Sequence, residues 1–219
     1  MRHASLHPPS RRRHLTRAAV GAGLAGSLAL ALSMGASLSG FTATITNSEN
    51  TTATAALAIE ETGGGSTCAS YDSTATCSTI NKYGGTTTPL VPGGSSTTTV
   101  TFTNTGSVAV GASTMKGGIC TATTRAGVTG ATTPSATNTD PGNLCSVLEL
   151  SVYKASTATG TPIFTGSPAA FQTATATTLG TLAVSGSQDY TFVVRFPSGA
   201  TTAVQGQQVS QTIAWKFDQ

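Results

Sequence analysis

The chain has 219 residues, of which only 9% are charged, and its formal net charge is +3. That charge comes from the start of the chain, because five of the 11 Lys and Arg residues precede Ser39 and all eight Asp and Glu residues follow it. The remainder has six basic and eight acidic residues, which leaves no basic surface for a phosphate backbone and predicts that nucleic acid is not a partner.

Residues 1–39 have the pattern of an export signal. Five arginines and no acidic residue precede the uncharged stretch AAVGAGLAGSLALAL at residues 18–32, and Ser37-Leu38-Ser39 supplies small residues before a cleavage site near Ser39 or Gly40. The stretch is shorter than the roughly 20 apolar residues that a membrane-spanning helix needs. We therefore predict a cleavable signal peptide, with signal peptidase as a partner during export and only transient membrane contact. A retained membrane anchor is the alternative.

The segments after this leader alternate apolar and polar residues with the period of half-buried strands. The first is residues 41–46, where Phe41, Ala43 and Ile45 alternate with threonines. Further strand-like segments follow at residues 53–61, 97–115, 147–155, 161–166, 177–184, 189–197 and 208–219. We interpret 97–115 as a hairpin with its turn at 104–107. Alternation predicts one row of apolar residues in each of three later segments: Leu148, Leu150 and Val152; Tyr190, Phe192, Val194 and Phe196; and Val209, Ile213, Trp215 and Phe217. We expect Trp215 to pack in the core beside Ile213 and Phe217.

Residues 62–97 and 117–146 are rich in Gly, Thr and Pro and predict loops. Each contains one cysteine pair, Cys68 with Cys77 and Cys120 with Cys145. Four cysteines allow three connectivities, and we favour the sequential one because each pair then encloses one loop-like segment. The expected architecture is a single all-β domain at residues 40–219, an antiparallel jelly-roll-like or immunoglobulin-like sandwich of eight or nine short strands without an amphipathic helix.

The three histidines, His3, His7 and His14, all lie in the predicted leader. The exported chain would then lack histidine, which excludes Ser-His-Asp and Cys-His catalysis and the HExxH metalloprotease motif. Asn138, Asp140 and Asn143 offer oxygen atoms that suit calcium, but Asp-Pro-Gly is typical of a turn. We therefore expect no enzymatic activity, no catalytic residues, no cofactor and no metal.

Several segments together resemble the TasA/camelysin family of secreted β-proteins from Gram-positive bacteria. They are the opening FTATITNSENT, the following TAALAIEE, the segment TVTFTNTGSVAV and the ending AVQGQQVSQTIAWKFDQ. The resemblance implies a jelly-roll domain exported through a SipW-type signal peptidase, and some family members polymerise into extracellular fibres of biofilms. Camelysin-type members have been classed as metallopeptidases, an activity that a chain without histidine does not inherit. The two cysteine pairs and the Thr-rich loops depart from the family and would make this a distant member.

Two functions from different classes follow. The first is a secreted structural or accessory subunit of the extracellular matrix or cell surface, with itself or other matrix and cell-wall components as partners. In this hypothesis Phe41, Ala43 and Ile45 belong to a strand that one subunit donates to the next, since an exposed strand can satisfy the edge of another sheet. The alternative is pairing of residues 41–46 within their own sandwich. The second function is a carbohydrate- or ligand-binding module that uses residues 117–146 and an exposed aromatic such as Tyr71 or Tyr83.

Mass spectrometry of the secreted protein tests the export hypothesis. We expect a mature N-terminus near Ser39 or Gly40 and peptides that link Cys68 to Cys77 and Cys120 to Cys145. An unprocessed chain inside cells with reduced thiols would contradict it.

Overall fold

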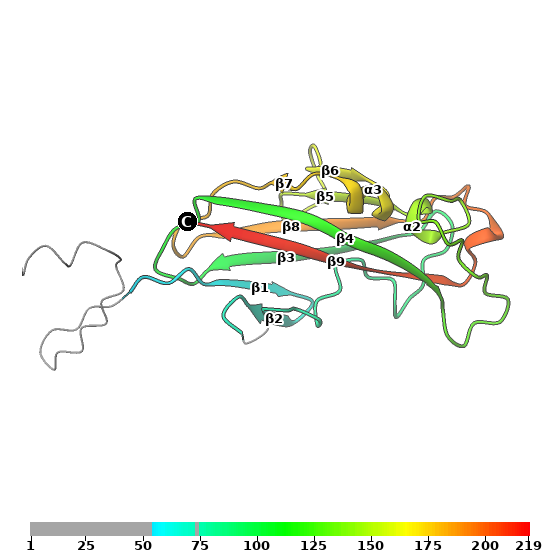
Figure 1. The fold of residues 1–219 in the computed structure, drawn as a ribbon, viewed down its shortest axis with the longest axis horizontal. Coiled ribbons are helices and arrows are strands. Elements are labelled where there is room, and N and C mark those ends of the chain that lie inside the picture. The colour runs from blue at the N-terminus through cyan, green and yellow to red at the C-terminus, as the bar shows by residue number, and fades with distance from the viewer. Residues whose placement is uncertain (1–53, 73–74) are drawn as a thin grey trace, which may run out of the picture. The chain divides into compact units, whose positions relative to one another are not determined.

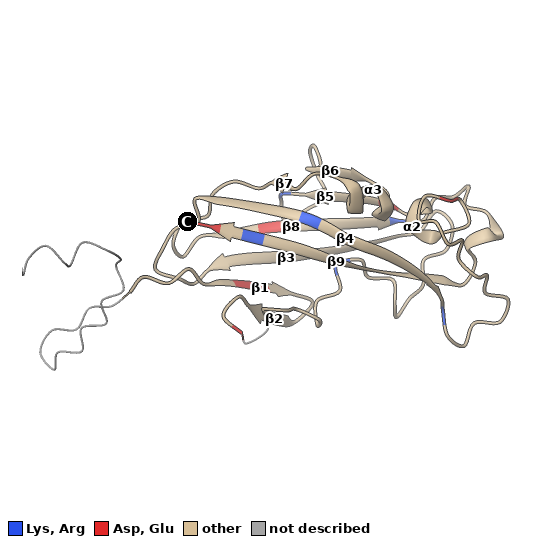
Figure 2. Ribbon diagram, viewed as in Figure 1, with Lys and Arg blue, Asp and Glu red and all other residues tan. Residues whose placement is uncertain are grey.

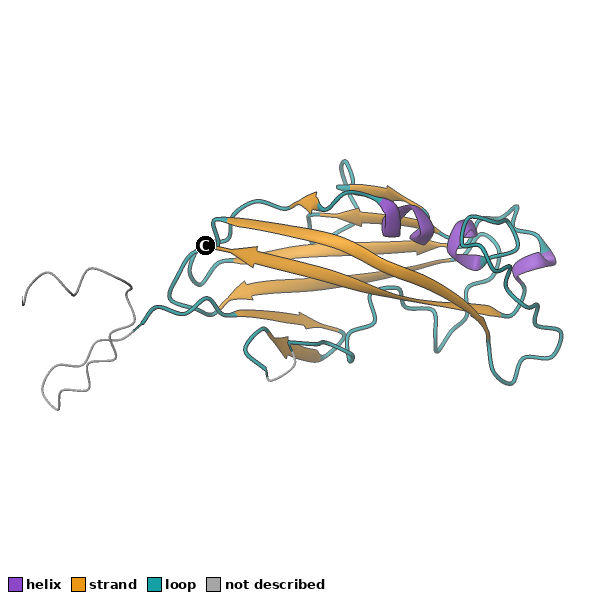
Figure 3. Ribbon diagram, in the orientation of Figure 1, coloured by secondary structure: helices purple, strands orange, loops and turns teal. Residues whose placement is uncertain are grey.

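The described residues form nine strands, arranged in two antiparallel sheets (Figure 1). The computed structural model describes residues 54–72 and 75–219, so the proposed leader and the segment 41–46 lie outside the described residues. Within these described residues, helix is confined to short pieces between strands (Figure 3). The expected all-β sandwich is therefore confirmed.

The larger sheet has six strands in the order β2-β1-β3-β8-β5-β6. Every neighbouring pair in this sheet is antiparallel. The strands are β1 (Ile59–Gly63), β2 (Ser66–Ala69), β3 (Ser95–Asn104), β5 (Glu149–Tyr153), β6 (Phe164–Gly166) and β8 (Ser187–Arg195).

The smaller sheet has three strands in the order β7-β4-β9. Two of them are long, β4 (Ala112–Thr124) and β9 (Gln207–Asp218), whereas β7 (Thr177–Thr178) is a short edge piece. The other elements are α2 (Leu144–Val147), α3 (Pro168–Thr173) and the 3₁₀ turn η1 (Thr202–Val204). Among the described strands, β9 has a partner on one side only.

The core lies between the two sheets and is built from alternate residues of the strands. In the larger sheet, the buried rows come from β3, β5 and β8: Val100, Phe102, Leu150, Val152, Tyr190, Phe192 and Val194. The smaller sheet contributes Met115 from β4 and the partly buried row of β9, which includes Trp215. The predicted inward rows of β5, β8 and β9 are confirmed, and so is the core position of Trp215.

The predicted hairpin at residues 97–115 is wrong. β3 pairs with β1 and β8 in the larger sheet, whereas β4 pairs with β7 and β9 in the smaller one. The cause is Asn104, a fully buried residue whose amide donates to the Val108 and Leu182 carbonyls and whose oxygen accepts from the Gly106 amide. These bonds hold residues 104–111 as a crossing between the sheets rather than as a tight turn.

The predicted loop at residues 117–146 is too long, because residues 117–124 belong to β4. Gly117 and Gly118 suggested a turn, but each lies where the chain packs closely. A Cβ at Gly117 would meet the Phe171 ring at 2.6 Å, and one at Gly118 would meet the Thr212 hydroxyl at 2.1 Å. The pairing with β9 shifts between Gly117 and Cys120, which is a β-bulge.

The predicted loop at residues 62–97 is also too long. It includes the end of β1, all of β2 and the start of β3, because a strand of four or five residues is hard to distinguish among glycines. An amphipathic helix was not expected, yet α3 buries Ala169 and Phe171. Its six residues are too few to show a helical period in the sequence.

Both disulfides join consecutive cysteines, Cys68 to Cys77 and Cys120 to Cys145. This is the sequential pairing that the sequence favours. Two disulfides are typical of a chain that folds in an oxidising, extracellular-type environment.

Candidate functional site

The outer edge of β9 is the first component of the candidate site. Val209, Gln211, Ile213, Trp215 and Phe217 point inward and are partly buried, whereas the intervening residues, from Gln208 to Lys216, are exposed. One side of β9 pairs with β4, and no described strand pairs with the other side. Unpaired backbone N–H and C=O groups along an edge form a template for another strand.

A groove of about 840 Å³ runs along this edge. One wall is β9 from Val209 to Phe217, and the opposite wall is made by β1, β2 and the segment after the first disulfide. Its apolar residues are Ile59, Ile80, Phe102, Val209, Ile213, Trp215 and Phe217. The groove therefore opens onto the sandwich core on the side where the smaller sheet ends.

Aromatic rings form the inner surface of the groove. The ring centroid of Trp215 lies 4.4 Å from that of Phe102 and 5.1 Å from that of Tyr190, and Phe217 lies 5.5 Å from Phe102. The indole nitrogen Nε1 of Trp215 is buried and has no hydrogen-bond partner among the described residues. Leaving a buried N–H unpaired costs about 1–3 kcal/mol. The core beneath the groove therefore keeps one unsatisfied donor among the described residues.

Residues 80–83, which we name the strap, cross the groove from β1 to β9. Ile80 is buried in the core, the Lys82 ammonium lies 2.5 Å from Oε1 of Glu61 in β1, and the Tyr83 hydroxyl donates to Oε1 of Gln211 in β9. Burial raises the pKa of Tyr83 well above its ordinary value. The side chain of Asn81 shapes the strap by accepting from the Tyr83 and Gly84 amides.

The ion pair of the strap is buried in a domain that carries few charges (Figure 2). The side chains of Lys82 and Glu61 are only 9% and 8% exposed. The exposed pair of Arg195 and Glu149 differs in both respects, because its atoms are 3.8 Å apart and its side chains are more than half exposed. Removing one member of a buried pair leaves an uncompensated charge, so the strap is held firmly in place.

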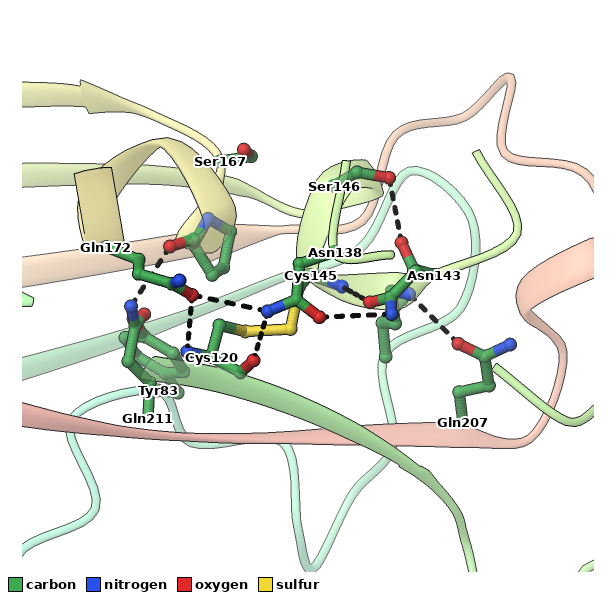
Figure 4. Close-up of a disulfide and its surroundings, with 12 residues drawn as sticks. Tyr83, Cys120, Asn138, Asn143, Cys145, Ser146, Ser167, Gln172, Gln207 and Gln211 are labelled. Atoms are coloured by element: carbon green, nitrogen blue, oxygen red, sulfur yellow. Dashed lines mark hydrogen bonds between the residues drawn. A yellow bond between two sulfur atoms is a disulfide. The ribbon is translucent and has the colours of Figure 1, made fainter. Parts of the chain in front are cut away.

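A second hollow, of about 790 Å³, lies beside the Cys120–Cys145 disulfide. Figure 4 shows the amide side chains at its base bonded to one another. Asn138 donates to the Cys120 carbonyl and to Gln172, Asn143 donates to Asn138, and Gln172 accepts from the Cys120 amide. No aromatic residue lines it.

The sequence motif around Asp140 is a turn. The side chain of Asn143 caps α2 by accepting from the Cys145 amide, and the backbone N–H of Asn143 donates to the Asp140 carbonyl. The described residues contain no cluster of three or more His, Cys, Asp or Glu side chains that could hold a metal ion. The interpretation of this motif as a turn agrees with these contacts.

The structure corrects the exposure expected for one of the two tyrosines proposed for glycan binding. Tyr71 is 62% exposed, as expected, and its hydroxyl donates to Glu60, a hydrogen bond that raises the pKa of Tyr71. Tyr83 is instead partly buried, because the strap turns its hydroxyl inward to Gln211. Gln211 is 128 positions away in the sequence, so no local pattern could reveal the contact.

The strand-donation residues Phe41, Ala43 and Ile45 lie outside the described residues. No helix in the described part of the chain is long and apolar enough to cross a membrane. The chain matches no protein-family model. A search of curated proteins likewise found no match.

The buried ion pair leads to a stability prediction. Lys82→Met should lower the free energy of unfolding by about 3–5 kcal/mol, because it leaves the Glu61 carboxylate buried without its partner. The double variant Glu61→Leu/Lys82→Met should regain most of that loss. Denaturant unfolding of the purified protein measures both.

Arg195→Met is the matched control, since it removes one member of the exposed pair and should change stability by about 1 kcal/mol or less. A Lys82→Met variant as stable as Arg195→Met would show that the strap is not held by this pair.

Proposed function

We propose that the protein is a secreted, non-enzymatic structural subunit of an extracellular matrix or cell surface. In this proposal residues 41–46 of one copy add to the free edge of β9 in the next copy. The observation that carries the proposal is an edge of β9 that pairs with no described strand and lies beside an apolar groove. Export is supported by the leader pattern of residues 1–39 and by the two disulfides.

The donor segment matches the groove in pattern and length. Phe41, Ala43 and Ile45 would enter the groove, and the threonines between them would continue the exposed row of β9. Six residues of antiparallel strand span about 20 Å, since each residue adds ~3.4 Å. Residues 212–217 of β9 have the same length and border the aromatic part of the groove.

The place where the chain enters the domain suits head-to-tail assembly. The Ala56 and Ala58 carbonyls accept hydrogen bonds from the amides of residues 105–107. In the same crossing between the sheets, the Gly111 amide donates to the Asp218 carbonyl at the end of β9. The chain therefore enters the sandwich at the end where β9 finishes. A donor segment and an acceptor edge are different surfaces, so their contact is head-to-tail, and it repeats into a filament when the rotation between copies does not close a ring.

The alternative function is a carbohydrate- or ligand-binding module, and the hollow beside the second disulfide would be its site. Its lining of Thr, Ser, Asn and Gln favours a polar ligand. The lack of an aromatic stacking surface and the mutual bonding of its amides make it the weaker candidate.

Electron microscopy and size measurement of the secreted protein test the proposal. We expect fibres from the intact chain and monomers after deletion of residues 40–47. Ile45→Asp should also prevent assembly, because it places a charge in the apolar groove, whereas Thr44→Asp on the exposed row should assemble normally.

Unchanged particle size after the deletion would contradict strand donation. Absence of fibres, together with binding of a glycan, would favour the binding module instead. Loss of that binding in Tyr71→Ala would place the glycan at Tyr71 rather than in the hollow beside the second disulfide.

A further inference from the structure

Strand donation along β9 requires something that fixes the register. Side chains of a strand alternate with a period of two, so a shift of two residues leaves every apolar residue facing the groove. The alternation of Phe41, Ala43 and Ile45 therefore cannot by itself select one position along β9. Another feature of the acceptor must do so.

The inward residues of β9 differ between its two halves. In the second half, Ile213, Trp215 and Phe217 are apolar and line the open groove. In the first half, Gln207 donates to the Gly142 and Ala203 carbonyls and accepts from the Leu144 amide. These polar contacts fill the interior beside Gln207, whereas Val209 in the same half still lines the groove.

Gln211 marks the boundary between these halves. Its amide nitrogen donates to the Gly118 carbonyl of β4 and to the Pro168 carbonyl at the start of α3, and its oxygen accepts from Tyr83. The partly buried Tyr83 side chain therefore lines the groove at this level of β9 and packs against the core. An apolar side chain of an added strand would have to displace it.

We propose that Tyr83, held by the strap against Gln211, is a register stop that confines the donated strand to residues 212–217 of β9. This inference rests on the proposed function, and the occupant is residues 41–46 of a second copy. The stop resists displacement because Ile80 anchors the strap in the core and Lys82 anchors it to Glu61 in β1. One register then repeats at every contact of the filament.

Cysteine cross-linking tests the stop. Thr44→Cys at the centre of the donor is combined in one chain with either Ala214→Cys or Ser210→Cys, two exposed positions on the same face of β9. We expect a ladder of disulfide-linked subunits with position 214, at least about tenfold stronger than with position 210, a preference equivalent to ~1.4 kcal/mol. Peptide mapping confirms that the two native disulfides remain.

A substitution in the strap provides a second test of the register stop. Tyr83→Ala should raise cross-linking at position 210, whereas the matched control Tyr71→Ala, which removes an exposed tyrosine, should leave the preference for position 214 unchanged. The comparison of positions 210 and 214 with the intact strap already decides the question if Tyr83→Ala does not fold.

Each outcome is informative. Equal ladders at both positions with the intact strap would overturn the register stop while supporting strand donation. Cross-links within single chains, or none at either position, would overturn the stop and place the failure in the proposed function itself.

Discussion

The unequal width of the two sheets is the constraint on which the rest of the structure depends. Six strands face three, so the smaller sheet ends at β9 while the larger one continues through β1 and β2. The apolar row of β9 is consequently only partly buried, and Trp215 keeps an unpaired N–H in the core. A further strand beside β9 would complete the sandwich, and the proposed function takes that strand from another copy.

The two ends of the groove differ in chemistry, and this difference favours an added strand at one end of β9 over the other. Aromatic rings from Phe102, Tyr190 and Trp215 gather where β9 finishes. At the opposite end, Gln211 accepts from the Tyr83 hydroxyl and donates to the Gly118 and Pro168 carbonyls. Apolar burial favours an added strand at the first end, and satisfied polar groups oppose it at the second.

The sequence predicts the fold class and the rows of β5, β8 and β9, because these depend on a period that the strands themselves carry. It ends the strand that contains Gly117 too early, because a glycine is typical both of a turn and of a close contact such as the one with Phe171. Only the tertiary fold determines which of the two applies. The groove could not be predicted for a similar reason. Tyr83 and Gln211, like Lys82 and Glu61, come from separate segments of the chain.

Hydrogen exchange of the purified protein, compared between separated subunits and the fibres that the proposed function expects, tests the edge of β9 most directly. The account predicts that amides of residues 212–217 facing away from β4 exchange fast in subunits and become protected in fibres. Amides of β5, which has a partner on both sides, should exchange alike in the two states. Equal protection of residues 212–217 before and after assembly would contradict the claim that β9 is the acceptor.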